Sequence, residues 1–322
     1  MSEAYNALLQ GNFYYNRRTA EDYRKAIGYY EEAIRLDPRY ALAYALLSRA
    51  ALNLGTGYGN LATKEQEELI AKARASAKSA LALDPNLADA HSSQGRILSD
   101  VDFNFAEAEA EYRRALELAP QNPAVTADLA SLMSTLGRLD EAVALQQRAI
   151  ALDPLRSASH FNLSLYLTGL GRYDDAEAAL RKVIALQPQS SQNYYRLAEI
   201  QILRGNSGAA VELAKQETDP GWRTFGMALA HFANGDRAEA DAALKKLIDE
   251  DADDAGSQIA QVYALRKEPE KMFEWLEHAW TTHDSGVNEL LSDPFLRAYK
   301  DDPRYIAFAQ RIGVMPKAAA NP

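Results

Sequence analysis

Three glycines lie within five positions in the stretch GTGYGNLATKEQEE, residues 55–68, and a glycine-rich loop can hold a phosphate through its backbone N–H groups. Such a loop must leave a strand and open a helix, and a Lys-Ser/Thr pair or a later acidic residue must complete the site. No strand is expected before this stretch and no Lys-Ser/Thr pair follows it, and Thr63-Lys64-Glu65-Gln66 instead has the form of a capping box that starts a helix. We therefore expect these glycines to lie in a helix–helix connection, with Gly55 at the turn and the remaining residues lengthening the next helix and adding a mobile surface loop.

Histidines and clustered acids could supply acid–base or metal chemistry, but their spacing favours other roles. His278 and His283 are five residues apart, which places them on different faces of a helix. His91, His160 and His231 fall at positions where packing or a hydrogen bond within a helical hairpin is expected. The acidic run at 249–254 lacks the spacing of a calcium-binding loop, and no GxSxG, HExxH or Walker motif occurs. We expect no catalytic site, no metal and no cofactor.

Composition limits the remaining classes of function. The 322 residues include no cysteine, which excludes disulfides, thiolate zinc sites and cysteine nucleophiles. The formal net charge of −10 repels a phosphate backbone, so nucleic acid is not an expected partner. No apolar run of 18 residues or export signal occurs, which predicts no membrane insertion and a cytoplasmic location, or a periplasmic one behind a fused membrane anchor.

A repeat organises the elements that must position any binding residues. Pro38, Pro85, Pro120, Pro154 and Pro188 are separated by 47, 35, 34 and 34 residues, and each follows a similar phrase such as AIRLDP, ALALDP or AIALDP. Proline lacks a backbone N–H and ends the apolar helix that precedes it. The interval between the first two prolines exceeds the period by 13 residues, which correspond to residues 56–68.

Small residues recur within this period. Alanine stands twelve residues before each of the five prolines, and Gly137, Gly171, Gly205 and Gly235 precede later second helices. Small side chains at helix crossings and a glycine at the turn are typical of a stacked helical hairpin. The period of 34 with its terminal proline resembles the tetratricopeptide repeat. We predict an all-α fold, a right-handed superhelix of about eight hairpins.

The expected organisation is a single solenoid domain over residues 1–316, with a disordered tail at 317–322. The sixth repeat is shortened in its second helix, and the last three repeats are degenerate. The predicted repeats span 4–38, 40–85, 88–120, 123–154, 157–188, 191–220, 221–252 and 253–284, with a cap at 285–316.

A narrower resemblance covers nearly the whole chain. The stretches GNFYYNRRTAEDYRKAIGYYEEAIRLDPRYALAYALLSRA, DVDFNFAEAEAEYRRALEL and MFEWLEHAWTTHDSGVNELLSDPFLRAYKDDPRY are similar to the tetratricopeptide region of certain bacterial signalling proteins. In that group the region follows an adenylate or guanylate cyclase domain or a winged-helix DNA-binding domain. The resemblance implies a sensing or protein-binding scaffold, and it implies no activity for any residue of this chain.

Repeat geometry indicates where a partner would bind. First helices line the concave surface of such a solenoid, at positions 2, 5, 6, 9, 12 and 13 of each repeat. The groove between repeats 1 and 6 is therefore the expected site for a protein or an extended acidic or C-terminal peptide. The candidate contact residues are Asn12, Asn16, Arg49, Asn53, Arg96, Asp128, Asn162, Tyr195, Arg196 and Phe225.

Several alternatives stay open. The inward arginines Arg49, Arg96 and Arg196 either bind a partner or pair with Asp100, Asp128 or Glu199 across neighbouring repeats. The insertion at 56–68 is a second possible contact surface. The chain could also act as a dimerisation module for a fused effector, or as an enzyme with an unrecognised site.

Overall fold

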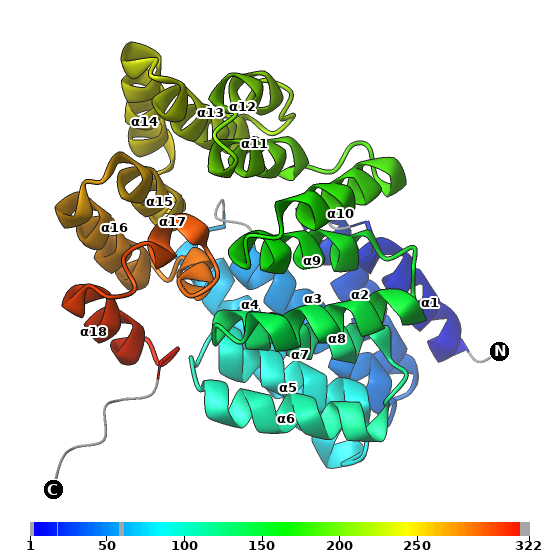
Figure 1. Ribbon diagram of the computed structural model, residues 1–322. Helices are drawn as coiled ribbons and strands as arrows, with labels where there is room; N and C mark the ends of the chain where they lie inside the picture. The colour runs from blue at the N-terminus through cyan, green and yellow to red at the C-terminus, as the bar shows by residue number, and fades with distance from the viewer. Residues whose placement is uncertain (1–2, 18, 58–60, 316–322) are drawn as a thin grey trace, which may run out of the picture. The chain divides into compact units, whose positions relative to one another are not determined.

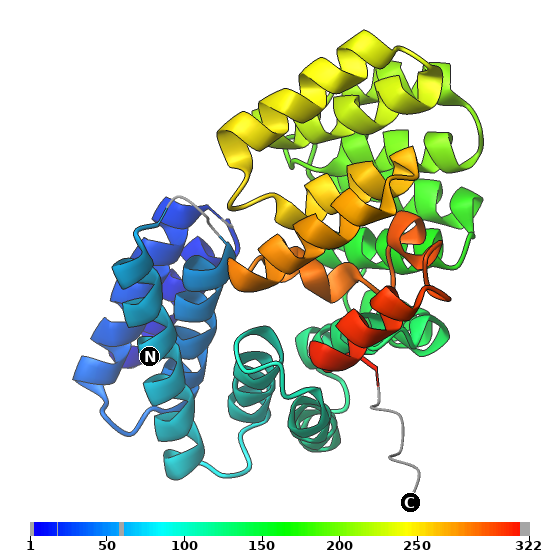
Figure 2. The same cartoon turned by 90° about the vertical axis from the view of Figure 1, so that its left-hand side faces the viewer.

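The computed structural model describes residues 3–17, 19–57 and 61–315, and within these ranges the chain is helical without a strand. Sixteen α-helices follow one another in eight pairs, which confirms the predicted all-α repeat fold (Figures 1 and 2). The hairpins are α1 (Glu3–Tyr15) with α2 (Ala20–Leu36), α3 (Ala41–Gly57) with α4 (Thr63–Leu83), α5 (Ala88–Asp100) with α6 (Phe105–Leu118), α7 (Pro123–Thr135) with α8 (Leu139–Leu152), α9 (Ser157–Gly169) with α10 (Tyr173–Leu186), α11 (Asn193–Leu203) with α12 (Ser207–Ala214), α13 (Pro220–Asn234) with α14 (Arg237–Asp251), and α15 (Gly256–Arg266) with α16 (Pro269–Thr281).

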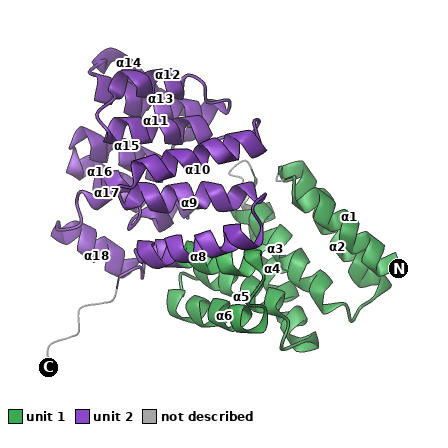
Figure 3. Ribbon diagram, turned by 45° about the vertical axis from the view of Figure 1, so that its right-hand side comes forward, with its two compact units in different colours: residues 1–132 green, residues 133–322 purple. Residues whose placement is uncertain are grey.

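The chain divides into two compact units (Figure 3). Unit 1 comprises residues 1–132 and unit 2 comprises residues 133–322, so the division falls within α7 of the fourth hairpin. Each unit is described by itself below. A single solenoid domain over 1–316 stays a prediction.

Small side chains sit where the two helices of a hairpin cross. The five alanines of the repeat, Ala26, Ala73, Ala108, Ala142 and Ala176, are completely buried. A larger side chain at such a position would hold the two helices apart, since protein interiors are packed without spare volume. The alanine spacing seen in the sequence is therefore the spacing of the helix crossings.

The four glycines predicted at turns adopt the left-handed backbone conformation that such turns require. Gly137, Gly171, Gly205 and Gly235 have φ values of 70°, 75°, 80° and 89°. This left-handed region is strained for residues with a Cβ, so glycine ends each first helix at little cost.

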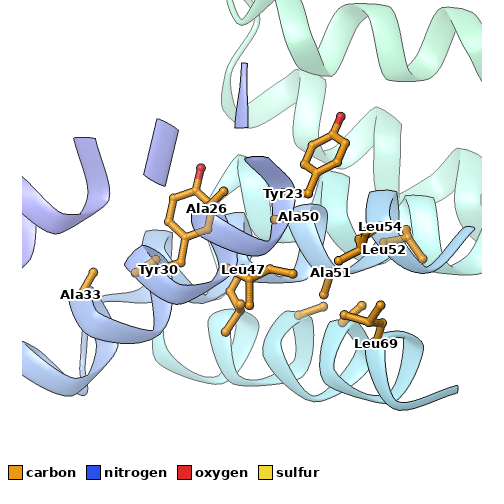
Figure 4. Packing of buried hydrophobic residues seen from close by; sticks show 14 of the residues in the cluster. Tyr23, Ala26, Tyr30, Ala33, Leu47, Ala50, Ala51, Leu52, Leu54 and Leu69 are labelled. Atoms are coloured by element: carbon orange, nitrogen blue, oxygen red, sulfur yellow. The ribbon is translucent and has the colours of Figure 1, made fainter. Parts of the chain in front are cut away.

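The core of unit 1 is built on these close approaches. Tyr30 is fully buried between Ala26, Ala33 and Leu47 (Figure 4). Its ring lies over Gly11, where an added Cβ would stand only 2.4 Å from the Cε1 atom of Tyr30. Glycine at position 11 thus admits the tyrosine that fills the first hairpin.

The glycine-rich stretch is only partly a connection. Helix α3 continues through Gly55 to Gly57, so the prediction of a turn at Gly55 is wrong. Glycine is favoured at this helical position because the helices α3 and α4 approach closely: a Cβ on residue 55 would stand 3.1 Å from the Cβ of Leu69. Helix α4 begins at Thr63 and runs for 21 residues, against 14 in α6, which confirms the lengthened second helix. Its N-cap is Ala62 rather than the threonine of the predicted capping box, and residues 58–60 lie outside the described part of the chain.

A cap follows the eighth hairpin in unit 2. It consists of the 3₁₀ helix η1 (Ser285–Glu289) and the helices α17 (Pro294–Arg297) and α18 (Pro303–Arg311). Asp293 and Asp302 are the N-caps, each followed by a first-turn proline, and Gly313 follows the last helix with φ 84°. Arg297 bonds to the carbonyl oxygen of Gly169, which ties the cap to α9.

Candidate functional site

In unit 1, polar side chains from four consecutive first helices meet on one face. The Asn53 amide donates to the hydroxyls of Tyr15, at 2.9 Å, and Tyr23, at 3.3 Å. Arg49 donates to Asp128 at 3.3 Å, and Ser92 donates to the same carboxylate oxygen at 2.7 Å. We call Tyr15, Arg49, Asn53, Ser92, Arg96 and Asp128 the first-helix network. It joins α1, α3, α5 and α7, which the repeat places next to one another.

Arg49 is the buried centre of this network. Its side chain is 8% exposed, and Asp89 stands 3.9 Å from the guanidinium as a second anion. Burial opposes the charged form, but the attraction of Asp128 outweighs it and holds the pKa of Arg49 above its usual value. The Nε atom has no hydrogen-bond partner. Arg49 therefore links the second hairpin to the third and fourth.

Arg96 is more accessible than Arg49 and less firmly held. Its side chain is 20% exposed, and its hydrogen bond to Asp100, one turn along α5, is long at 3.4 Å. Burial of Tyr15 opposes ionisation of its hydroxyl, but Arg49 and Arg96 together lower the pKa of Tyr15. Both guanidiniums thus act on the same small region. Since Asp89, Asp100 and Asp128 surround them, the positive charge is compensated within the unit.

The predicted amides divide into two kinds. Asn12 accepts a 2.8 Å hydrogen bond from the Tyr30 hydroxyl, and Asn53 is committed to the two tyrosines described above. Asn16 lies at the exposed end of α1. Asn162 lies half-buried on α9, in unit 2. Within unit 1, the exposed amide among these predicted residues is therefore that of Asn16, next to Tyr15 of the network.

In unit 2, the predicted aromatic residues form a packed cluster. Tyr195 stacks on Trp222 with ring centroids 4.9 Å apart, and Phe225 contacts both rings. Tyr195 and Phe225 are buried, whereas Trp222 is half-buried. Gly226 permits this contact, because a Cβ there would come within 2.8 Å of the Tyr195 Cβ.

Arg196 ties α11 to the cap through a second set of charges. It donates to Glu199 at 3.0 Å and to both carboxylate oxygens of Glu289 at 3.1 and 2.9 Å. Asp293 interacts electrostatically with Arg196, Glu199 and Glu289. Burial and the charge of Glu199 raise the pKa of Asp293 to about 8. We call Arg196, Glu199, Glu289 and Asp293 the cap network.

The cap network carries more carboxylates than cations. Burial raises the pKa of Glu199, and its Oε1 atom has no hydrogen-bond partner. Asp293 accepts from the Leu296 N–H through Oδ1 at 2.8 Å, while its Oδ2 atom is buried without a partner. At neutral pH the Asp293 carboxyl therefore carries a proton in the folded protein.

The sequence left open that the inward arginines pair with acids across neighbouring repeats, and the observed pairs differ from this in detail. Asp128, Asp100 and Glu199 are the acids that it named, but two of the three pairs lie within one helix rather than across repeats. Glu289, the bidentate partner of Arg196, lies 93 residues away in sequence and was missed. Nothing in the repeat register signals it, because η1 belongs to the cap.

Three of the histidines bond to groups at the ends of hairpins. His91 and His160 bond the carbonyl oxygens of Pro85 and Pro154 at 2.9 and 3.0 Å, six residues back in both cases. His231 bonds Asp236 at 2.9 Å, across the turn into α14. The part of the chain that the structure describes contains no cluster of three or more His, Asp or Glu side chains arranged to hold a metal ion.

Stacked antiparallel hairpins with small residues at their crossings define the class as a helical-repeat solenoid. Models of the tetratricopeptide repeat match residues 15–57, 102–160, 167–216 and 225–254, which together make up more than half of the chain. The protein belongs to the tetratricopeptide-repeat family. A search of curated protein sequences finds no significant match.

Two solved structures with a TM-score above 0.5 share this fold at low sequence identity. A chain of the APC/C hetero-tetramer Cut9–Hcn1 has a TM-score of 0.58 and 17% identity, over 86% of this chain and 52% of that one. The type IV pilus biogenesis factor PilW has a TM-score of 0.51 and 20% identity, over 75% of this chain and 98% of its own. YrrB, described as a tetratricopeptide protein with an unusual peptide-binding site, has a TM-score of 0.42 and 19% identity, over 67% and 97% of the two chains. Across the described residues, no helix is both long and apolar enough to cross a membrane.

Proposed function

We propose that the chain is a non-catalytic scaffold that holds an extended segment of a partner protein along the first-helix network of unit 1. Tetratricopeptide proteins are in general protein-interaction scaffolds rather than enzymes. The observation that carries the proposal is the convergence of Tyr15, Asn53, Ser92 and Asp128 from four first helices. Side chains that fix one another lose little entropy when a partner binds.

The accessible edge of the network gives the proposed contacts. Arg96 and Asp100 offer both signs of charge, and Asn16 adds an amide that can pair with a peptide backbone. We leave Tyr195, Arg196 and Phe225 out of the contact surface, since they are buried. The resemblance to bacterial signalling proteins supports a role in a cytoplasmic signalling or regulatory system.

Replacing Arg96 with glutamine should weaken binding of the partner segment about ten-fold, because a charge-assisted hydrogen bond is lost. Isothermal titration with that segment measures the change. Arg114→Gln is the control, since Arg114 is exposed on α6, a second helix. Equal affinities of native protein and Arg96→Gln would exclude Arg96 as a contact. A screen for nucleotide turnover that survives repurification tests the absence of catalysis.

A second candidate function is self-association, which one surface feature favours. Tyr5, Leu9 and Phe13 are 39%, 41% and 57% exposed and are spaced by four residues, so they form one stripe along α1. The outer face of a terminal repeat is usually polar. A second copy, with its own α1 antiparallel, could cover this stripe.

If α1 mediates a dimer, Leu9→Ser with Phe13→Ser should shift the protein to monomer in sedimentation velocity. The expected change is at least ten-fold in the dimer dissociation constant, because two large apolar side chains per copy leave the interface. Leu155→Ser is the control, since Leu155 is 73% exposed in the turn before α9. A native protein that stays monomeric at high concentration would rule this candidate out.

A further inference from the structure

A basic pocket in unit 2 lies where the repeat is interrupted. It is lined by Lys215, Arg223, Thr224, Met227, Ala243 and Lys246, from the end of α12 and from α13 and α14, and it is a shallow, open pocket of about 390 Å³. Helix α12 has 8 residues, whereas α8 and α10 have 14 each. Lys215, the C-cap of α12, lines the pocket, so the pocket lies beside the end of the shortened helix.

The cations of this pocket differ from those of the first-helix network. The Arg223 guanidinium donates to a neutral acceptor, the carbonyl oxygen of Glu217, at 3.2 Å. The carboxylate of Glu217 is buried and accepts from the backbone N–H groups of Tyr194, Tyr195, Thr218 and Asp219. Among the described residues no carboxylate stands within 4 Å of Arg223 as an ion-pair partner. Its charge is therefore available to an incoming anion.

The two lysines are paired only with exposed acids on their own helices. Lys215 contacts Glu212 at 2.7 Å, and Lys246 lies 3.8 Å from Glu250. Exposed pairs of this kind are weak and exchange readily for other partners. Asp219 is engaged as the N-cap of α13, through the Trp222 N–H. Asp251 interacts electrostatically with Lys246, but in the part of the chain that the structure describes Arg223 has no such acid beside it.

We propose that this pocket is a docking site for an acidic segment of a protein partner, with a Glu or Asp carboxylate at Arg223 and Lys246 and an apolar neighbour on Met227 and Ala243. The apolar floor and the size of the pocket suit one or two side chains of a peptide. A phosphate is usually held by backbone N–H groups, but the N-terminus of α13 is already occupied by Asp219. Arg223 and Met227 lie outside the inner-wall positions of their repeat, so this site is distinct from the first-helix network.

The test uses a fluorescein-labelled ten-residue peptide of alternating Glu and Leu, followed by fluorescence anisotropy at low ionic strength. Arg223→Gln with Lys246→Gln should weaken binding at least ten-fold, since two charge-assisted contacts are removed. Ala243→Leu should also weaken it, because it fills the half-buried floor without a change in charge. The affinity should fall as NaCl is added.

Lys245→Gln is the matched control, since Lys245 is adjacent in sequence, exposed, and paired with an acid one turn away. It should leave binding unchanged. Loss of binding with Lys245→Gln to the same extent would show a nonspecific charge effect and overturn the proposal. Equal binding of a Gln–Leu peptide, or displacement of the acidic peptide by equimolar inorganic phosphate, would contradict it as well. A far-UV circular dichroism spectrum establishes that each variant is folded.

Discussion

Replacing Arg49 with methionine should lower the free energy of unfolding by about 3–5 kcal/mol, because it removes the buried cation that contacts the half-buried Asp128 and Asp89. Urea unfolding followed by far-UV circular dichroism measures this change. All three tryptophans, Trp222, Trp275 and Trp280, lie in unit 2, so their fluorescence reports on unit 2 only. Arg49 lies in unit 1, so the loss of stability should be visible in circular dichroism, which reports on the helices of both units.

Lys72→Met is the control for Arg49→Met. Lys72 contacts Glu31 at 2.5 Å, but the two side chains are 40% and 47% exposed, and such pairs contribute about 0–1 kcal/mol. Arg49→Met with Asp128→Leu should recover part of the lost stability, since the unpaired charge is then also removed. A cost for Arg49→Met as small as that of Lys72→Met would mean that the first-helix network does not hold the hairpins together.

Asp293→Asn should flatten the pH dependence of the stability of unit 2. The pKa of Asp293 is about 8 in the folded protein, whereas an unfolded aspartate has a pKa of about 3.9. Between these values the folded state holds a proton that the unfolded state lacks. The free energy of unfolding therefore falls as the pH rises through this window, by up to about 1.4 kcal/mol per unit. The stabilising contribution is complete below pH 4 and absent above pH 8.

The groups around Asp293 set this behaviour and allow a clean comparison. Arg196 and Glu199 of α11, Glu289 of η1 and Tyr305 of α18 all interact with it electrostatically. Asparagine keeps the N-cap acceptor but cannot ionise. The variant should therefore lose less stability than the native protein when the pH is raised from 5 to 9. Tryptophan fluorescence during thermal unfolding at pH 5, 7 and 9 provides the measurement.

Asp302→Asn is the control for this titration. Asp302 caps α18 in the same way, but it is only half-buried, and a hydrogen bond from Arg304 lowers its pKa. Its contribution changes only below about pH 4, with stability lost as the pH falls. Parallel stability curves for native protein and Asp293→Asn from pH 5 to pH 9 would show that Asp293 is ionised in the folded state.

The sequence predicts the hairpins because their determinants are local. Ala26 and Ala142 mark crossings, Gly137 and Gly171 mark turns, and these fall at one period. The prediction fails at Gly55, where glycine serves a close helix contact instead of a turn, and residue type alone does not distinguish these uses.

The site is less predictable than the fold, because it depends on contacts between distant residues. Repeat register places Arg49 and Asp128 on one face, but it does not predict the hydrogen bond between them, which joins the second hairpin to the fourth. The link from Arg196 to Glu289 depends on how the cap folds back onto α11. The basic pocket lies at the end of the shortened α12, but its lining comes from three helices, so the shortened repeat alone does not predict it.

Site-specific photo-crosslinking tests the proposed scaffold function most directly. A photoreactive phenylalanine analogue replaces Asn16 at the edge of the first-helix network in one variant and Lys78 on the exposed side of α4 in another. The account predicts that the Asn16 position crosslinks one defined segment of a partner, identified by mass spectrometry, and that the Lys78 position does not. Crosslinks to the partner from Lys78 alone would contradict it.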